Sequence, residues 1–149
     1  MARSTETRIA DAKQLLRAGG SDAWLATASD SVPHVVPLSL AWDDHDQSLL
    51  FCTKRRSITA ENIGEDGAEV RVILGTSRDV VAVDGTATVL GFVEDCSQGQ
   101  LFTSQTGWNP ATEPGVWVYI RVELRRVQAW RDVAEITGRT IMKNGTWLE

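Results

Sequence analysis

The chain has 149 residues, 42% of them hydrophobic and 23% charged, which is the balance of a folded globular domain. A chain of this length can form one domain around a core that needs no disulfide or metal. The formal net charge of −5 argues against nucleic acid as the main partner, because nucleic-acid-binding domains usually have a net basic surface. We find no apolar segment of signal-peptide or membrane-span length, and therefore expect a cytoplasmic protein without membrane contact.

The N-terminal part predicts a covering helix followed by two strands. The helix begins near Ser4 or Thr5 and ends at the glycine pair 19–20, and its apolar residues share one face: Ile9, Ala12, Leu15 and Leu16. A strand is expected over 23–28, and a turn at Asp30 leads into a second strand over 34–42.

The second strand has one face of large side chains and one of small side chains. The large face, expected to be core, holds Val36, Leu38, Leu40 and Trp42. The small face includes Pro37 and Ser39, and Pro37 cannot donate a ladder hydrogen bond, so the strand should lie at a sheet edge or open at a bulge. Open backbone beside small side chains can receive a flat ring.

The segment 49–63 combines an apolar strand, three cations and a helix start. Lys54, Arg55 and Arg56 follow the strand directly, and Ser57 is a good N-cap for a short helix that Gly64 would end. Positive charge beside free helix N–H groups suits a phosphate. The alternative is an ordinary solvated turn, since charged loops are common and no capping box is present.

The second half of the chain predicts three more strands, over 70–74, 80–93 and 116–130, and a helix around 98–105. Gly85 and Gly91 should mark bends that let the sheet curl. About six strands, few helices and no internal repeat or linker predict one domain over 1–149. Its expected fold is a mainly β, closed or nearly closed antiparallel barrel.

The last strand carries two aromatic residues on its charged face. Its inward residues are expected to be Val116, Val118, Ile120, Val122 and Leu124. Trp117 and Tyr119 then point outward, where they suggest either a subunit contact or ordinary covering surface.

Side chains typical of acid–base, nucleophilic or metal chemistry are sparse. His34 precedes a strand and His45 lies in a turn beside aspartates, which does not suit a Ser-His-Asp arrangement. The aspartates at 43, 44 and 46 are typical turn formers, and Cys52 and Cys96 match no metal or disulfide spacing. We therefore predict no catalytic side chain, no metal site and reduced cysteines.

Several runs, in this order, resemble the split-barrel flavin-binding relatives of pyridoxamine 5'-phosphate oxidase, and most of all their actinobacterial branch of probable coenzyme F420-dependent enzymes. The runs are AWLATAS, PHVVPLSLAWD, LLFCTKRRSITAENI, RDVVAVDGTA and GRTIMKNGTWL. The resemblance implies a six-stranded antiparallel split β-barrel of Greek-key type with a few short flanking helices. It also implies a homodimer with the cofactor in a groove between subunits.

The resemblance assigns parts of this chain to the cofactor. Backbone groups of Val36, Pro37, Leu38 and Ser39 would line the ring. The phosphate would be held by Thr53, Lys54, Arg55, Arg56 and Ser57, together with Asn62. Many relatives have Ser-x-Lys-x-x-Asn in this helix, whereas Thr59 occupies the lysine position here and leaves the charge to the basic residues before the helix. Trp108, in the loop before the last strand, can stack on the ring or close the groove, or simply pack.

The sequence therefore predicts an oxidoreductase that uses FMN or coenzyme F420. It would transfer a hydride between the cofactor and a small unsaturated or heteroaromatic substrate, and the cofactor would carry the redox chemistry. A non-catalytic carrier or a tetrapyrrole (haem or biliverdin) binder on the same fold is the main alternative. A structural dimer without a ligand is a third.

Overall fold

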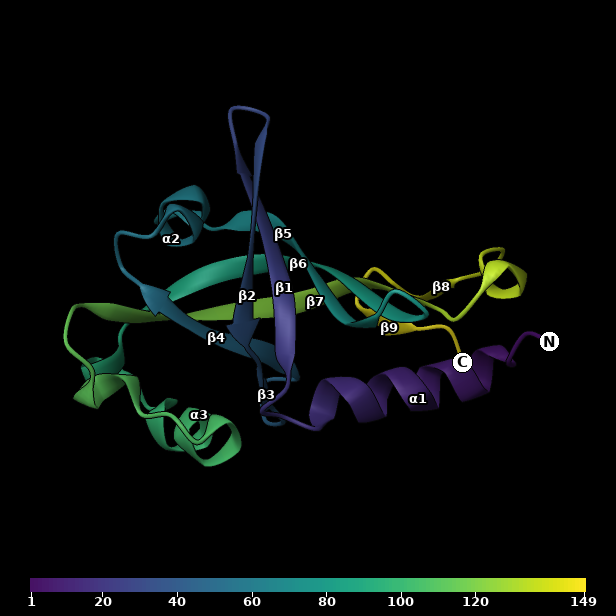
Figure 1. The fold of residues 1–149 in the computed structure, drawn as a ribbon, viewed down its shortest axis with the longest axis horizontal. Helices are drawn as coiled ribbons and strands as arrows, with labels where there is room; N and C mark the ends of the chain where they lie inside the picture. The colour runs from purple at the N-terminus through teal and green to yellow at the C-terminus, as the bar shows by residue number, and fades with distance from the viewer.

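Nine strands form one antiparallel sheet in the computed structural model of residues 1–149 (Figure 1). The strands are β1 (Asp22–Ser29), β2 (Val32–Ser39), β3 (Ala41–Asp43), β4 (Ser48–Lys54), β5 (Ala68–Thr76), β6 (Asp79–Phe92), β7 (Trp117–Trp130), β8 (Thr140–Lys143) and β9 (Thr146–Trp147). The helices are α1 (Thr5–Arg17), α2 (Ile58–Ile63) and α3 (Gly99–Thr106), with 3-10 turns η1 (Val93–Asp95), η2 (Pro110–Thr112) and η3 (Val133–Glu135).

The sheet order is β2-β1-β5-β6-β7-β4-β3. Outside this order, β8 pairs with β7 and β9 pairs with β8. The mainly β antiparallel fold predicted from the sequence is confirmed. The six strands of seven residues or more are the six expected from periodicity, and the short β3, β8 and β9 raise the total to nine. The expected strand over 34–42 is interrupted at Leu40, which separates β2 from β3. None of the helices has the length and apolar character that crossing a bilayer requires.

The predicted edge position of β2 is confirmed, since β2 pairs only with β1. Pro37 is exposed there, opposite Trp24, while Val36 and Leu38 on the other face are half-buried. An edge strand tolerates a proline because one side of it has no neighbouring strand to which an N–H could donate. The hairpin of β1 and β2 projects beyond the rest of the sheet (Figure 1).

One large apolar core lies between the sheet and α1. Ser4 caps this helix by accepting a hydrogen bond from the backbone N–H of Thr7 (3.1 Å), as the sequence predicted. Ile9, Ala12 and Leu16 belong to the core cluster, together with inward residues of β1 and β3 to β8 and with Leu40 and Ile63. Burial of these side chains is the main stabilising contribution to the fold.

A second, smaller apolar cluster lies on the outer face of β4 and β7, beneath α3. Phe102 of α3 packs on Tyr119 with ring centroids 5.4 Å apart, and both side chains are fully buried. Tyr119 therefore lies on the face opposite the main core, as predicted, but the chain's own helix α3 covers it, so that it is not available for the subunit contact that was one of the two expectations. Val116, expected to be inward, is 52% exposed because β7 begins only at Trp117.

Candidate functional site

The junction of β4 and α2 presents the three cations that the sequence singled out. β4 is buried up to Thr53, and the chain emerges from the sheet at Lys54. Lys54, Arg55 and Arg56, which we call the basic triplet, are all exposed. Ser57 caps α2 as predicted: its Oγ accepts a hydrogen bond from the backbone N–H of Ala60 at 3.1 Å. Gly64 ends the helix with a positive φ of 68°, a conformation that glycine adopts readily.

Two hydroxyl groups lie beside the basic triplet. The Thr53 hydroxyl donates to Ser57 Oγ at 3.2 Å. Ser57 Oγ thus accepts two hydrogen bonds, from Thr53 and from the Ala60 N–H. A hydroxyl has two acceptor lone pairs and one proton, so the Ser57 proton is left to donate to a ligand.

The basic triplet has no carboxylate partner within the protein, since every ion pair of the chain involves other cations. Two of its members instead lie over aromatic rings. Lys54 Nζ is 5.6 Å from the Trp117 ring centroid, and the Arg55 guanidinium is 5.3 Å from that of Phe92. Such contacts fix where a cation sits without neutralising it. The charge of the triplet therefore remains available to an anion.

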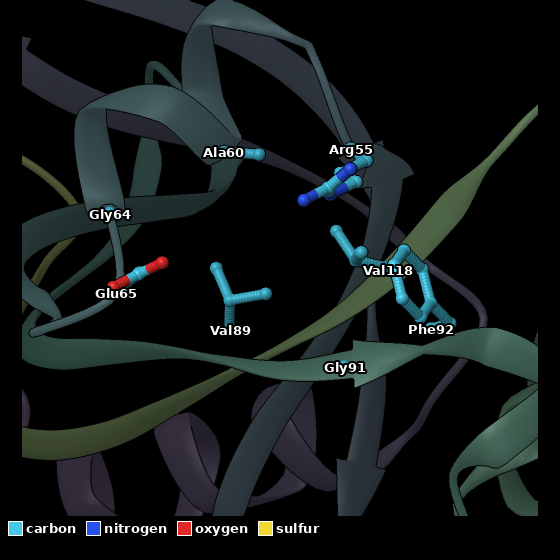
Figure 2. Close-up of a pocket in the computed structure, with 8 residues that line it drawn as sticks. All are labelled: Arg55, Ala60, Gly64, Glu65, Val89, Gly91, Phe92 and Val118. Atoms are coloured by element: carbon cyan, nitrogen blue, oxygen red, sulfur yellow. The ribbon is translucent and has the colours of Figure 1, made fainter.

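Two hollows open on either side of Arg55. The first, which we call the loop hollow, has a volume of about 300 Å³ and is lined by Lys54, Arg55, Arg56 and Val116. The second, which we call the barrel hollow, has a volume of about 340 Å³ and lies between α2 and the adjoining ends of β6 and β7 (Figure 2). Its lining residues are Arg55, Ala60, Gly64, Glu65, Val89, Gly91, Phe92 and Val118.

A β-bulge shapes the apolar side of the barrel hollow. Val89 pairs with Ile120 and Phe92 with Val118, so that a step of three positions along β6 matches a step of two along β7. Cross-strand partners project to the same face, so the extra residue returns Phe92 to the face of Val89 and Val118. Gly91, at φ of 137°, supplies the backbone conformation that this bulge needs. The bend that the sequence predicted at Gly91 is thus a bulge beside the site.

The structure brings together some of the predicted cofactor residues and separates others. Lys54, Arg55 and Arg56 share the loop hollow, and Thr53 and Ser57 adjoin it through the chain and their own hydrogen bond. The ring segment Val36, Pro37, Leu38 and Ser39 lies on the edge strand β2, which α2 also contacts. None of these four residues lines either hollow.

Three predicted residues have structural partners that the sequence did not indicate. The Asn62 amide donates to the Thr27 hydroxyl at 3.0 Å and so ties α2 to β1. Thr59 is 1% exposed and lies on the buried side of α2. Trp108 packs edge-on against Trp117 at 5.1 Å, and its indole N–H donates to Glu113 at 3.1 Å. Roles for these three in cofactor binding remain predictions.

Sequence reasoning missed Glu65, Val89, Phe92 and Val118 as lining residues. Three of them are ordinary members of strand patterns, and periodicity cannot tell a core position from one at an open mouth of a barrel. The available signal was Gly91, a glycine inside a strand, which often marks a bulge near a functional site.

Groups for conventional catalysis do not converge here. His34 lies on β2, and His45 is exposed in the turn between β3 and β4, where it contacts Asp46 at 3.0 Å. No three His, Cys, Asp or Glu side chains gather where they could hold a metal ion. Burial raises the pKa of the Cys52 thiol to about 12, which keeps it protonated and unreactive at neutral pH.

The donor set around the basic triplet fits a phosphate group. Phosphate oxygens bind cations and O–H or N–H donors, and here three unpaired cations lie beside the Ser57 hydroxyl. A carboxylate in the same place would compete for the cations, but none lines the loop hollow. The residues present can therefore hold the phosphate tail of a nucleotide-like cofactor.

No family model matches the sequence, and no curated protein matches it significantly. Solved structures do match the fold. A protein of the pyridoxinephosphate oxidase family from Clostridium acetobutylicum, related to general stress protein 26, superimposes with a TM-score of 0.66. The identity is 11%, over 88% of this chain and 92% of that one.

Two further structures have ligands in their names. A FAD-binding protein from Mesorhizobium loti is 22% identical, with a TM-score of 0.59 over 80% of this chain and 91% of that one. A heme binding protein from Mycobacterium smegmatis is 13% identical, with a TM-score of 0.67 over 97% of this chain and 60% of that one. The chain thus has the split-barrel fold of the pyridoxamine 5'-phosphate oxidase-like proteins.

Proposed function

We propose that this protein is a flavin- or deazaflavin-dependent oxidoreductase that binds FMN or coenzyme F420. The observation that carries the proposal is the basic triplet, three exposed cations without a carboxylate partner, beside the cap of α2 in a fold shared with flavin-binding proteins. An acidic chain that keeps such a cluster unpaired has an evident use for it in anion binding.

In this proposal the side chains bind and orient, and the cofactor, when bound, supplies hydride transfer. Lys54, Arg56 and the Ser57 hydroxyl hold the phosphate end. The exposed edge of β2, with Val36 to Ser39, offers backbone groups to the ring. We assign no side chain as acid or base, and the reaction partner is a small unsaturated or heteroaromatic molecule.

The proposal includes a homodimer. A ring lying on the edge of β2 would be open to solvent in a single chain, and a second subunit would exclude water from it. The outer face of β1 and β2 is suited to such a contact, since Trp24 and Val35 are 53% and 52% exposed and Pro37 lies directly opposite Trp24. Exposed apolar clusters of this kind are typical of interfaces.

A tetrapyrrole binder is the second candidate, favoured by the likeness to the heme binding protein. Haem iron in proteins is usually held by His, Cys, Met or Tyr. No such residue lines either hollow, and Tyr119 is fully buried beneath α3. Neither hollow therefore offers a ligand for haem iron, whereas the basic triplet offers cations to a phosphate; on β2, His34 is the residue that could ligate haem iron.

The test is a titration of cofactor-free protein with FMN and with F420, read by quenching of tryptophan fluorescence. Lys54→Ala and Arg56→Ala should each weaken binding at least about tenfold, because a hydrogen bond to a charged group contributes about 1.5 to 3 kcal/mol. F420, whose tail adds carboxylates to the phosphate, should lose more affinity than FMN as salt rises.

Lys143→Ala is the matched control, since this exposed lysine lies on β8, far from α2 (Figure 1). It should leave both affinities unchanged. Failure of both cofactors to bind below the millimolar range would exclude the oxidoreductase, and a Soret band on adding haem would then favour the tetrapyrrole binder. Binding of FMN alone would exclude F420 and leave the reaction class intact.

A further inference from the structure

The barrel hollow carries opposite charges on two of its sides. Arg55 enters it from the loop before α2, and Glu65 from the residue after the helix cap, and Figure 2 shows both charged ends directed into the hollow. Both residues are exposed and neither forms an ion pair within the protein. The two charges therefore face the same space without neutralising each other.

The surface between these charges is apolar. Val89, Phe92 and Val118 project into it from β6 and β7, and Ala60 closes it from α2 (Figure 2). The Phe92 ring also holds the Arg55 guanidinium at 5.3 Å, so the cation has a defined place at the edge of the apolar surface. An apolar surface between a fixed cation and a carboxylate suits a ligand with the complementary arrangement.

The size of the hollow limits that ligand. Its volume of about 340 Å³ lies at the lower end of the range for small-molecule sites, roughly 300 to 1,000 Å³. A molecule with a single ring fits a space of this size. The barrel hollow and the loop hollow share only Arg55 among their lining residues.

We infer that the barrel hollow is the substrate subsite and that it takes a small one-ring zwitterion. Arg55 binds its anionic group, Glu65 binds its ammonium or N–H group, and Val89, Phe92 and Val118 contact its ring. Glu65 is then a specificity-determining residue. This inference rests on the proposed function, because it identifies the class of molecule that would meet the cofactor.

Three probes that share one ring test the inference by calorimetric titration of the full chain. They are 4-(aminomethyl)benzoate with both charges, 4-methylbenzoate with the anion alone and 4-methylbenzylamine with the cation alone. Solvent-exposed ion pairs are each worth at most about fivefold in affinity. We therefore expect the zwitterion to bind roughly fivefold more tightly than either single-charge probe.

Two variants assign the discrimination to its residues. Glu65→Gln should lower the affinity of the zwitterion to that of 4-methylbenzoate and leave 4-methylbenzoate unchanged. Arg55→Gln should lower the affinity of the zwitterion to that of 4-methylbenzylamine and leave the affinity of 4-methylbenzylamine unchanged. Glu61→Gln is the matched control, because Glu61 is an exposed carboxylate of α2 that does not line the hollow.

Equal affinity for the three probes, or no binding of any, would overturn the inference; the second result is expected if a partner subunit fills the hollow. Titrating the same samples with FMN and F420 separates this result from the proposed function. Cofactor binding without probe discrimination refutes the subsite alone. Discrimination that depends on Glu65 without cofactor binding supports the subsite and refutes the oxidoreductase.

Discussion

At the scale of single residues, Gly91 connects the backbone of β6 to the chemistry of the barrel hollow. Its φ of 137° lies where residues with a side chain are strained, and the bulge beside it aligns Phe92 with Val89. Phe92 in turn holds Arg55. A glycine that appears in the sequence as a bend thus sets the position of a cation on another element.

Gly91→Ala should destabilise the protein by about 1 to 3 kcal/mol, the usual cost of forcing a strained backbone conformation. Steric overlap adds little, since the new Cβ would meet Cys96 Sγ at an ordinary 3.6 Å. Urea denaturation measures the effect. Gly99→Ala is the control. Gly99 begins α3 without a positive φ, and a Cβ added there would also have only an ordinary contact. This substitution should leave the stability unchanged or raise it.

At the scale of elements, a buried ion pair fastens the segment before α1 to η3. Glu135 is 2% exposed and accepts hydrogen bonds from the Arg3 guanidinium (2.6 Å), the Arg3 backbone N–H (2.7 Å) and the Arg131 backbone N–H (2.9 Å). The buried Arg8 of α1 adds bonds to the carbonyls of Glu135 and Gly138. The hydrogen bonds to the carboxylate itself, mainly those from the Arg3 side chain, hold the pKa of Glu135 at about 2.

This pair predicts a loss of stability in acid. The pKa of Glu135 is lower in the folded protein than its ordinary value of 4.5, so its stabilisation is complete above about pH 4.5 and is lost as the pH falls through about 2. The loss should approach about 3 kcal/mol. Urea denaturation between pH 6 and 2 should show this component in the wild type and not in Glu135→Gln. Parallel profiles for the two proteins would contradict it.

The helix caps, the bends of β6 and the Glu135 ion pair differ in how far a sequence pattern can predict them. The apolar face and cap of α1 follow from local spacing and were predicted, as were the cap of α2 and the glycine bends of β6. The clamp on Glu135 joins residues 132 positions apart, and no local pattern marks it. For the same reason the basic triplet was recognisable in one run of sequence, whereas Glu65, Val89 and Val118 meet only through folding.

At the scale of the whole molecule, the protein covers some of its apolar surface itself and leaves some open. Strand periodicity correctly placed Tyr119 on the face opposite the main core, but it could not tell what would cover that face. The answer is α3, whose Phe102 lies on Tyr119. The face of β1 and β2 that carries Trp24 has no such helix. α1 packs with Ala23 and Leu25, and α2 is tied to Thr27, and these residues point to the opposite face of β1.

The uncovered face leads to the last prediction, that the protein is a dimer held through Trp24, Val35 and Pro37. Stable homodimers commonly bury roughly 2,000 Å² or more, and a central tryptophan often contributes about 2 kcal/mol or more. Sedimentation at low micromolar concentration should give about twice the chain mass of 16.3 kDa. Trp24→Asp should shift the protein toward the monomer. Val133→Asp is the control: Val133 is also an exposed apolar residue, 83% exposed, but it lies on η3, away from the proposed interface, so this variant should remain a dimer. A wild-type protein that sediments only as a 16.3 kDa species would refute the dimer and leave the edge of β2 open to solvent.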